Sequence, residues 1–200
     1  MPDPAPPPDS LRREIKRGIW GAARFASFDA RGMHYFNVTR QGLRRSFLAA
    51  LVSLPFFIAV IALSYRPTEI PQYLNIALGY GLSWVLFPLI MIPVLLALQL
   101  DKAYTPLIVA YNWAKVIVYG LSLVTALLFY TDTSLTITLT LAFRIVSMLY
   151  RWFVAKVALQ SGILIPFVIV VIDEVIGAFL SRGLLHLFGQ IPTVAALHAQ

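Results

Sequence analysis

Five long apolar segments constrain the fold of this chain more than any other feature of its sequence. They cover residues 46–64, 73–100, 106–130, 134–159 and 162–188. A helix needs about 20 mostly apolar residues to cross the hydrocarbon core of a bilayer. The composition agrees, because 59% of the residues are hydrophobic and only 12% are charged, against about 25% charged in an average soluble domain. The sequence therefore predicts an all-α integral membrane protein, a five-span transmembrane helix bundle.

Residues 134–141 (SLTITLTL) alternate polar and apolar side chains, which is a strand pattern. A lone strand in lipid would leave its backbone N–H and C=O groups unpaired, which costs several kcal/mol per group. In a helix, a threonine hydroxyl can instead donate to a carbonyl one turn back. We therefore predict a helix here, although the alternation leaves open a helix start as late as Leu139.

The first span is preceded by a tail and a basic arm. Residues 1–10 contain five prolines and no apolar periodicity, so we predict a disordered tail, and we expect residues 189–200 to form a second tail. Residues 11–45 form the arm, which holds nine of the chain's 16 Lys and Arg residues. Its apolar residues at helical spacing are Leu11, Ile15, Ile19, Ala22 and Ala26.

This pattern predicts a basic amphipathic helix at the start of the arm. Such helices lie in the headgroup layer of a membrane, where anionic lipids attract their positive charges. A solvated helix docked on the protein's own cytoplasmic face is the alternative, and the sequence favours neither. The side chains predicted to contact lipid headgroups are Arg12, Arg13, Lys16, Arg17, Trp20 and Arg24.

The distribution of basic residues also predicts the orientation in the membrane. With five spans, the basic arm, Lys102 and Lys156 lie on one side, whereas Arg66 and Arg182 lie on the other. Because positive residues favour the cytoplasmic side, we expect a cytoplasmic N-terminus. Arginine outnumbers lysine by twelve to four, which is typical of a GC-rich bacterial gene and suggests a bacterial inner membrane.

Four charged residues within the spans form the candidate site, namely Lys115, Arg144, Asp173 and Glu174. At about 1.5 Å per residue, each lies roughly 14–18 Å from the nearer end of its span, which is the middle of a core about 30 Å thick. A charge at that depth needs a partner or water. Arg151 lies closer to the cytoplasmic end, so we expect its side chain to snorkel to the interface.

Two interpretations of this charge cluster remain open. The bases pair with the acids to fix the helix register, or the cluster lines a polar pathway for protons, ions or a small anion. Equal numbers of acids and bases favour pairing. The polar residues at helical spacing from the cluster, which a pathway would use, are Asn112, Tyr119, Ser122 and Ser181.

The remaining composition excludes several function classes. Without cysteine, the chain has no disulfide, thiolate nucleophile or Cys-ligated metal, and its scattered histidines give no metal-site spacing. It carries no hydrolase elbow, phosphate loop or dinucleotide fingerprint, so we expect neither an enzyme nor a cofactor. A basic arm beside a membrane favours lipid over nucleic acid.

The sequence thus favours a small accessory, assembly or scaffold component of a membrane complex. Its expected partners are the anionic leaflet and either another membrane protein or a second copy of the chain. The alternative function is a small permease or channel that uses the charge cluster.

Overall fold

The computed structural model describes residues 10–65, 67–128 and 133–189. Nearly all of the two predicted tails, and Arg66, lie outside these residues. The described part is helical, and five of its helices are long and apolar enough to span a membrane. Its elements are α1 (Leu11–Ala26), η1 (Ala30–Tyr35), α2 (Arg40–Ser46), α3 (Leu48–Ser64), α4 (Ile70–Ala97), η2 (Asp101–Ala103), α5 (Tyr104–Leu128), α6 (Thr133–Leu159) and α7 (Leu164–Phe188).

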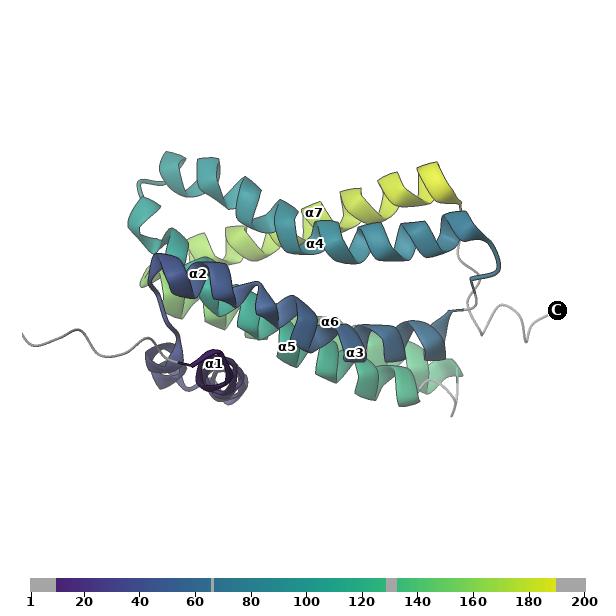
Figure 1. The fold of residues 1–200 in the computed structure, drawn as a ribbon, viewed down its shortest axis with the longest axis horizontal. Coiled ribbons are helices and arrows are strands. Elements are labelled where there is room, and N and C mark those ends of the chain that lie inside the picture. Colours follow the sequence, from purple (N-terminus) through teal and green to yellow (C-terminus); the bar gives the residue numbers. More distant parts are fainter. Residues whose placement is uncertain (1–9, 66, 129–132, 190–200) are drawn as a thin grey trace, which may run out of the picture.

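The five long helices form two layers (Figure 1). In one layer α5 packs along both α3 and α6, and in the other α4 pairs with α7. The layers are joined where α7 contacts α6 and where α4 meets α5 and η2. We call the end of the bundle that holds α1 and η2 the α1 end, and the end that holds the α3–α4 turn the far end.

The core of the bundle is centred on the first half of α5. Residues 107–114 are all buried, and the Tyr111 ring stacks on Phe87 of α4 with centroids 4.4 Å apart. By contrast, large apolar side chains on the outer faces are exposed, such as Leu89 at 58% and Phe179 at 75%. An apolar exterior of this extent is unusual for a soluble monomer and normal for helices solvated by lipid.

The alternating segment 134–141 is helical, because α6 begins at Thr133. The start of the arm is helical as expected, because α1 covers Leu11–Ala26, and η1 and α2 follow it before the first long helix begins. In Figure 1 α1 is viewed end-on, so it lies across the long axis of the bundle.

The face by which α1 packs on the bundle overlaps the predicted apolar stripe in part, because Ala22 is buried and Ile15 and Ile19 are half-buried against the core. Leu11 and Ala26 of that stripe are exposed. The buried residues of α1 are Glu14, Gly18, Gly21, Ala22 and Phe25. Small residues suit this face because α1 lies close to α5 and η1.

Two contacts at this face are especially close. A Cβ atom on Gly18 would lie 2.3 Å from two ring carbons of Trp113, which is 3% exposed. One on Gly21 would lie 2.8 Å from the backbone oxygen of Gly32. Farther along α1, the Tyr150 hydroxyl of α6 donates to the Ala22 carbonyl at 3.0 Å.

Glu14 is buried beside a basic partner from α2. The Arg45 Nη1 atom lies 2.6 Å from its carboxylate, and the Asn37 side-chain amide donates to the same group at 3.3 Å. A buried carboxylate is tolerated when it is paired and hydrogen-bonded, so this contact holds α1 to the segment that leads into α3.

Candidate functional site

An arginine that we expected at the membrane surface lies at the centre of the charge cluster. Arg151 Nη1 is 2.5 Å from Asp173 Oδ2, and its Nη2 donates to Glu174. The Arg151 side chain is only 15% exposed, so the prediction that it snorkels is wrong. The planar guanidinium fork explains this arrangement, because it can donate to two acceptors at once.

The predicted cluster is brought together only in part. Arg144 Nη2 lies 2.8 Å from Glu174 Oε2, although the Arg144 side chain is 66% exposed. Arg144 and Arg151 are two helical turns apart on one face of α6, and both donate to Glu174 of α7. One of the two interpretations of the sequence expected Arg144 to pair with an acid of α7, whereas neither gave Arg151 a central role.

Lys115 does not pair with a carboxylate within the described residues. Its Nζ atom donates to the Ser83 carbonyl of α4 at 2.7 Å and lies 4.7 Å from the centre of the Trp84 ring. Asp173 and Arg151 act on it electrostatically without a direct hydrogen bond. The Tyr119 ring stacks on the Trp84 ring, with centroids 6.3 Å apart.

The charge balance therefore differs from the predicted one. With Arg151 included, three bases (Lys115, Arg144 and Arg151) share two acids (Asp173 and Glu174), which leaves one positive charge in excess. Because the two acids pair with the arginines, the excess charge resides on Lys115. Its neighbours are a carbonyl oxygen and an aromatic face, both of which stabilise a cation.

The predicted polar lining is dispersed. Asn112 is fully buried and donates to Ser46 Oγ at 2.9 Å, so it joins α5 to α2 instead of facing a pathway. Ser122 donates to the Val118 carbonyl of its own helix. Ser181 is exposed and borders a cleft.

Sequence reasoning also missed Tyr111, which lies one turn before Lys115 on α5. Its hydroxyl is buried, makes no hydrogen bond to any described residue, and is near enough to interact electrostatically with Asp173 and Glu174. Its position four residues before Lys115, on the same helix face, could have identified Tyr111 from the sequence.

A cleft of about 480 Å³ opens between α3, α4 and α7 toward the far end. Its lining combines aromatic and aliphatic side chains with small and polar ones, including Phe57, Tyr80, Ser83, Gly79, Gly177 and Ser181. Contacts between α3 and α4 are sparse, so the cleft is not filled by the protein's own helices.

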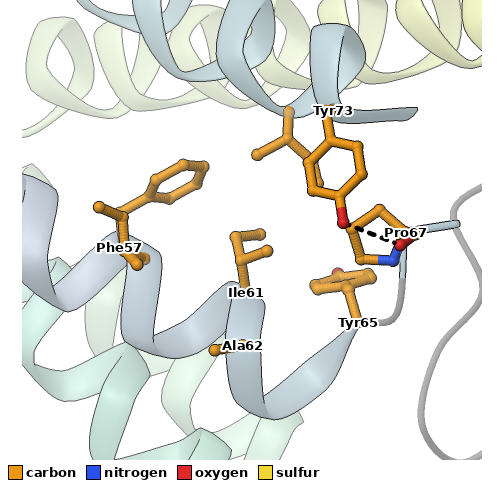
Figure 2. A pocket seen from close by; sticks show the side chains of 8 residues that line it. Phe57, Ile61, Ala62, Tyr65, Pro67 and Tyr73 are labelled. Atoms are coloured by element: carbon orange, nitrogen blue, oxygen red, sulfur yellow. Dashed lines mark hydrogen bonds between the residues drawn. The ribbon is translucent and has the colours of Figure 1, made fainter. Parts of the chain in front are cut away.

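A second hollow of about 430 Å³ adjoins this cleft at the α3–α4 turn. The two share Ile76 of α4 and, from α3 and its end, Phe57, Ile61 and Tyr65, which project toward α4 (Figure 2). The Tyr73 hydroxyl donates to the Pro67 carbonyl at 3.1 Å and closes one side.

At its other limit the cleft lies next to the charge cluster. Ser83 lines the cleft, and its carbonyl accepts the Lys115 hydrogen bond. Gly177, which also lines it, is one turn beyond Asp173 and Glu174 on α7. The cleft and the cluster are therefore parts of one region.

The arm residues predicted to contact lipid fall into two groups. Arg12, Arg13, Lys16, Arg17 and Trp20 are exposed. Arg24 instead pairs with Asp29 at 2.7 Å, and its guanidinium lies over the Tyr35 ring.

Asp29 also binds Arg31, outside the long helices. The Arg31 side chain and its backbone N–H donate to Asp29, and these bonds lower the pKa of the Asp29 carboxyl to about 2. Arg24 and Arg31 thus both contact Asp29, the residue that caps the N-terminus of η1.

Among the residues described, no group of three or more His, Asp or Glu side chains could hold a metal ion. No family model, no curated protein and no solved structure matches the chain.

Proposed function

We propose that this protein is a non-enzymatic accessory, assembly or scaffold component of a membrane complex. The observation that carries this proposal is the cleft between α3, α4 and α7, which the protein's own helices leave open. We propose that it receives one transmembrane helix of a partner membrane protein.

The lining of the cleft suits a helix. Gly79, Gly177 and Ser181 are small, and small residues allow two helix backbones to approach closely in lipid. Polar side chains such as Asn75 and Ser83 lie between apolar ones, and they offer hydrogen bonds to a polar side chain of the incoming helix.

The charge cluster supports the same proposal. Asp173 and Glu174 are both satisfied by Arg151, so they require no opposite charge from a partner. The ion pairs of Arg151 with these two acids join α6 to α7. They therefore fix how the two layers of helices lie against each other, and with it the shape of the cleft.

In this proposal the protein lies in a bacterial inner membrane with a cytoplasmic N-terminus. The basic arm, Lys102 and Lys156 then belong to the α1 end, on the cytoplasmic side. Because α1 lies across the bundle, its exposed basic residues run along the surface of that leaflet.

Filling the cleft tests the proposal. Gly177→Leu adds a large side chain where nothing lies within 4 Å of a Cβ atom, so we expect normal folding and loss of the partner. Gly183→Leu is the matched control, since Gly183 is on the same helix, is equally unobstructed and does not line the cleft.

The measurement is site-specific photocrosslinking from Ser181 in cells, followed by purification in mild detergent. We expect a crosslinked membrane protein in the wild type and in Gly183→Leu, and at least a tenfold weaker band in Gly177→Leu. A band of unchanged strength in Gly177→Leu contradicts the proposal. A crosslink to a second copy of this chain would contradict a separate partner protein and would show that the protein forms a homo-oligomer.

A small permease or channel is the second candidate. It is favoured by the excess charge on Lys115 and by the cleft that ends at Ser83, where Lys115 is bound. Such a protein would use Lys115, Arg144, Arg151 and the two acids to pass a small anion or a proton.

Flux measurements separate the two candidates. As a scaffold, the purified protein should leave proteoliposomes as tight to protons, chloride and phosphate as empty vesicles. A flux that is present in the wild type, absent in a folded Glu174→Gln variant and unchanged in Glu69→Gln, at the exposed α3–α4 turn, would make the second candidate the better one.

A further inference from the structure

A groove on the arm combines an apolar floor with two basic side chains. It has a volume of about 400 Å³ and is lined by Lys16, Arg17, Ile19, Trp20 and Tyr35. These residues come from one side of α1 and from the end of η1. Trp20 is 58% exposed, so much of a large apolar ring faces outward.

Contacts between α1 and η1 hold the walls of this groove in place, and none of them involves the charge cluster. Gly21 of α1 and Gly32 of η1 approach so closely that a Cβ on Gly32 would lie 2.6 Å from the Gly21 oxygen. Arg17 of α1 donates to the His34 carbonyl of η1 at 3.4 Å, and the Arg24 guanidinium lies 5.6 Å from the centre of the Tyr35 ring. The groove is therefore a formed feature of the fold.

The chemistry of the lining selects an amphipathic anion. Lys16 and Arg17 are exposed and basic, and both types of side chain bind phosphate. Ile19 and Trp20 offer apolar surface beside them, and tryptophan prefers the boundary between headgroups and acyl chains. A small free anion would leave the apolar floor uncovered, and an acidic peptide would bring a polar backbone onto it.

We propose that this groove binds one anionic phospholipid of the leaflet at the α1 end. Lys16 and Arg17 contact its phosphate, and the first part of an acyl chain lies on Ile19 and Trp20. This inference rests on the membrane placement in the proposed function, but it requires neither the partner helix nor a transported substrate. It goes beyond a diffuse attraction of the arm to the membrane, because it assigns a stoichiometric site.

The test is native mass spectrometry of the full chain in a mild neutral detergent, titrated with phosphatidylglycerol or phosphatidylcholine. We expect one tightly retained phosphatidylglycerol and only weak, unsaturated binding of phosphatidylcholine. A double variant, Lys16→Gln with Arg17→Gln, should bind phosphatidylglycerol about 30-fold more weakly, given the usual contribution of each basic residue at an anionic surface.

The matched control changes the same residue types outside the groove. Lys102→Gln with Arg44→Gln removes two exposed basic residues and should alter the affinity by about twofold or less, because screening weakens charges that lie farther from the lipid. Lys16→Gln alone, at an exposed position, keeps the test decisive if the double variant does not fold. We expect it to weaken binding about fivefold.

Further ligands distinguish the sources of the anion. Glycerol phosphate, which has the headgroup without chains, should not compete at millimolar concentration, and polyglutamate should not displace the lipid. Equal binding of phosphatidylcholine, competition by either soluble anion, or equal losses in the groove and control variants would each overturn the proposal. Because no partner is present, these outcomes do not depend on whether the cleft receives a helix.

Discussion

Replacing Arg151 with methionine is expected to destabilise the protein by about 3–5 kcal/mol, the usual result of removing one partner of a buried ion pair. Arg151 satisfies Asp173 and Glu174 together, and its side chain and that of Asp173 are 15% and 13% exposed. In the variant Asp173 loses the ion pair, whereas Glu174 keeps Arg144. Methionine preserves most of the apolar contacts of the arginine stem. The loss of stability is therefore due to removal of the charge.

The free energy of unfolding in detergent, from titration with a denaturing detergent, measures this effect. Arg144→Met is the matched control on the same helix face. Because the Arg144 side chain is 66% exposed, its loss should cost only about 0–1 kcal/mol. Adding Asp173→Asn to Arg151→Met should recover part of the stability, because it removes the uncompensated carboxylate. Equal losses for Arg144→Met and Arg151→Met would show that Arg151 is not the central partner.

Arg151 also shows what can be predicted by counting residues from the end of a span to estimate depth in the membrane. Counting residues from the span ends placed Arg144, Asp173 and Glu174 at one level, and Arg144 does meet Glu174. The same counting assigned Arg151 to the surface. Which charges meet also depends on how α6 and α7 are rotated about their axes, and packing sets that rotation. Two residues on the same helix face, seven positions apart, can therefore reach the same acceptor.

The spans themselves were predictable, because each is a long apolar run. Helix ends differ by a few residues from the expected ones, such as Ile70 instead of residue 73 for α4. The cleft could not be predicted, since it results from the divergence of α3 from α4 and from no local pattern. The apolar pattern of the sequence predicts how many long helices there are, but not how they are arranged relative to one another.

The packing of the arm was less predictable than the spans, because the backbone of α1 lies very close to α5 and to η1. Periodicity selects large apolar residues, yet Leu11 is exposed while Gly18 and Glu14 are buried. Glu14 is buried because Arg45, 31 positions away, pairs with it. Only the tertiary fold brings these two residues together, so the apolar pattern within α1 does not indicate that Glu14 is buried.

The close approach at Gly18 leads to the second large effect. Gly18→Ala should destabilise the protein by about 1–3 kcal/mol, the range for overpacking a filled core. The new methyl group would lie 2.3 Å from the Cδ2 and Cε2 atoms of Trp113, and this ring is 3% exposed. The ring has little room to move, so α1 must shift away from α5. The segment between α1 and α3 should then be cleaved faster by protease.

Gly81→Ala separates this clash from the general effect of glycine replacement. Nothing lies within 4 Å of a Cβ at Gly81 in α4, so the protein should be unchanged or up to about 1 kcal/mol more stable, as for glycine to alanine in a helix interior. Unfolding free energies and rates of limited proteolysis measure both variants. If Gly18→Ala were as stable as Gly81→Ala and no more sensitive to protease, α1 would not lie on Trp113. The groove at α1 and η1 would then lose the contact of α1 with α5 and would be held on the bundle by the contacts of α1 and η1 with α6.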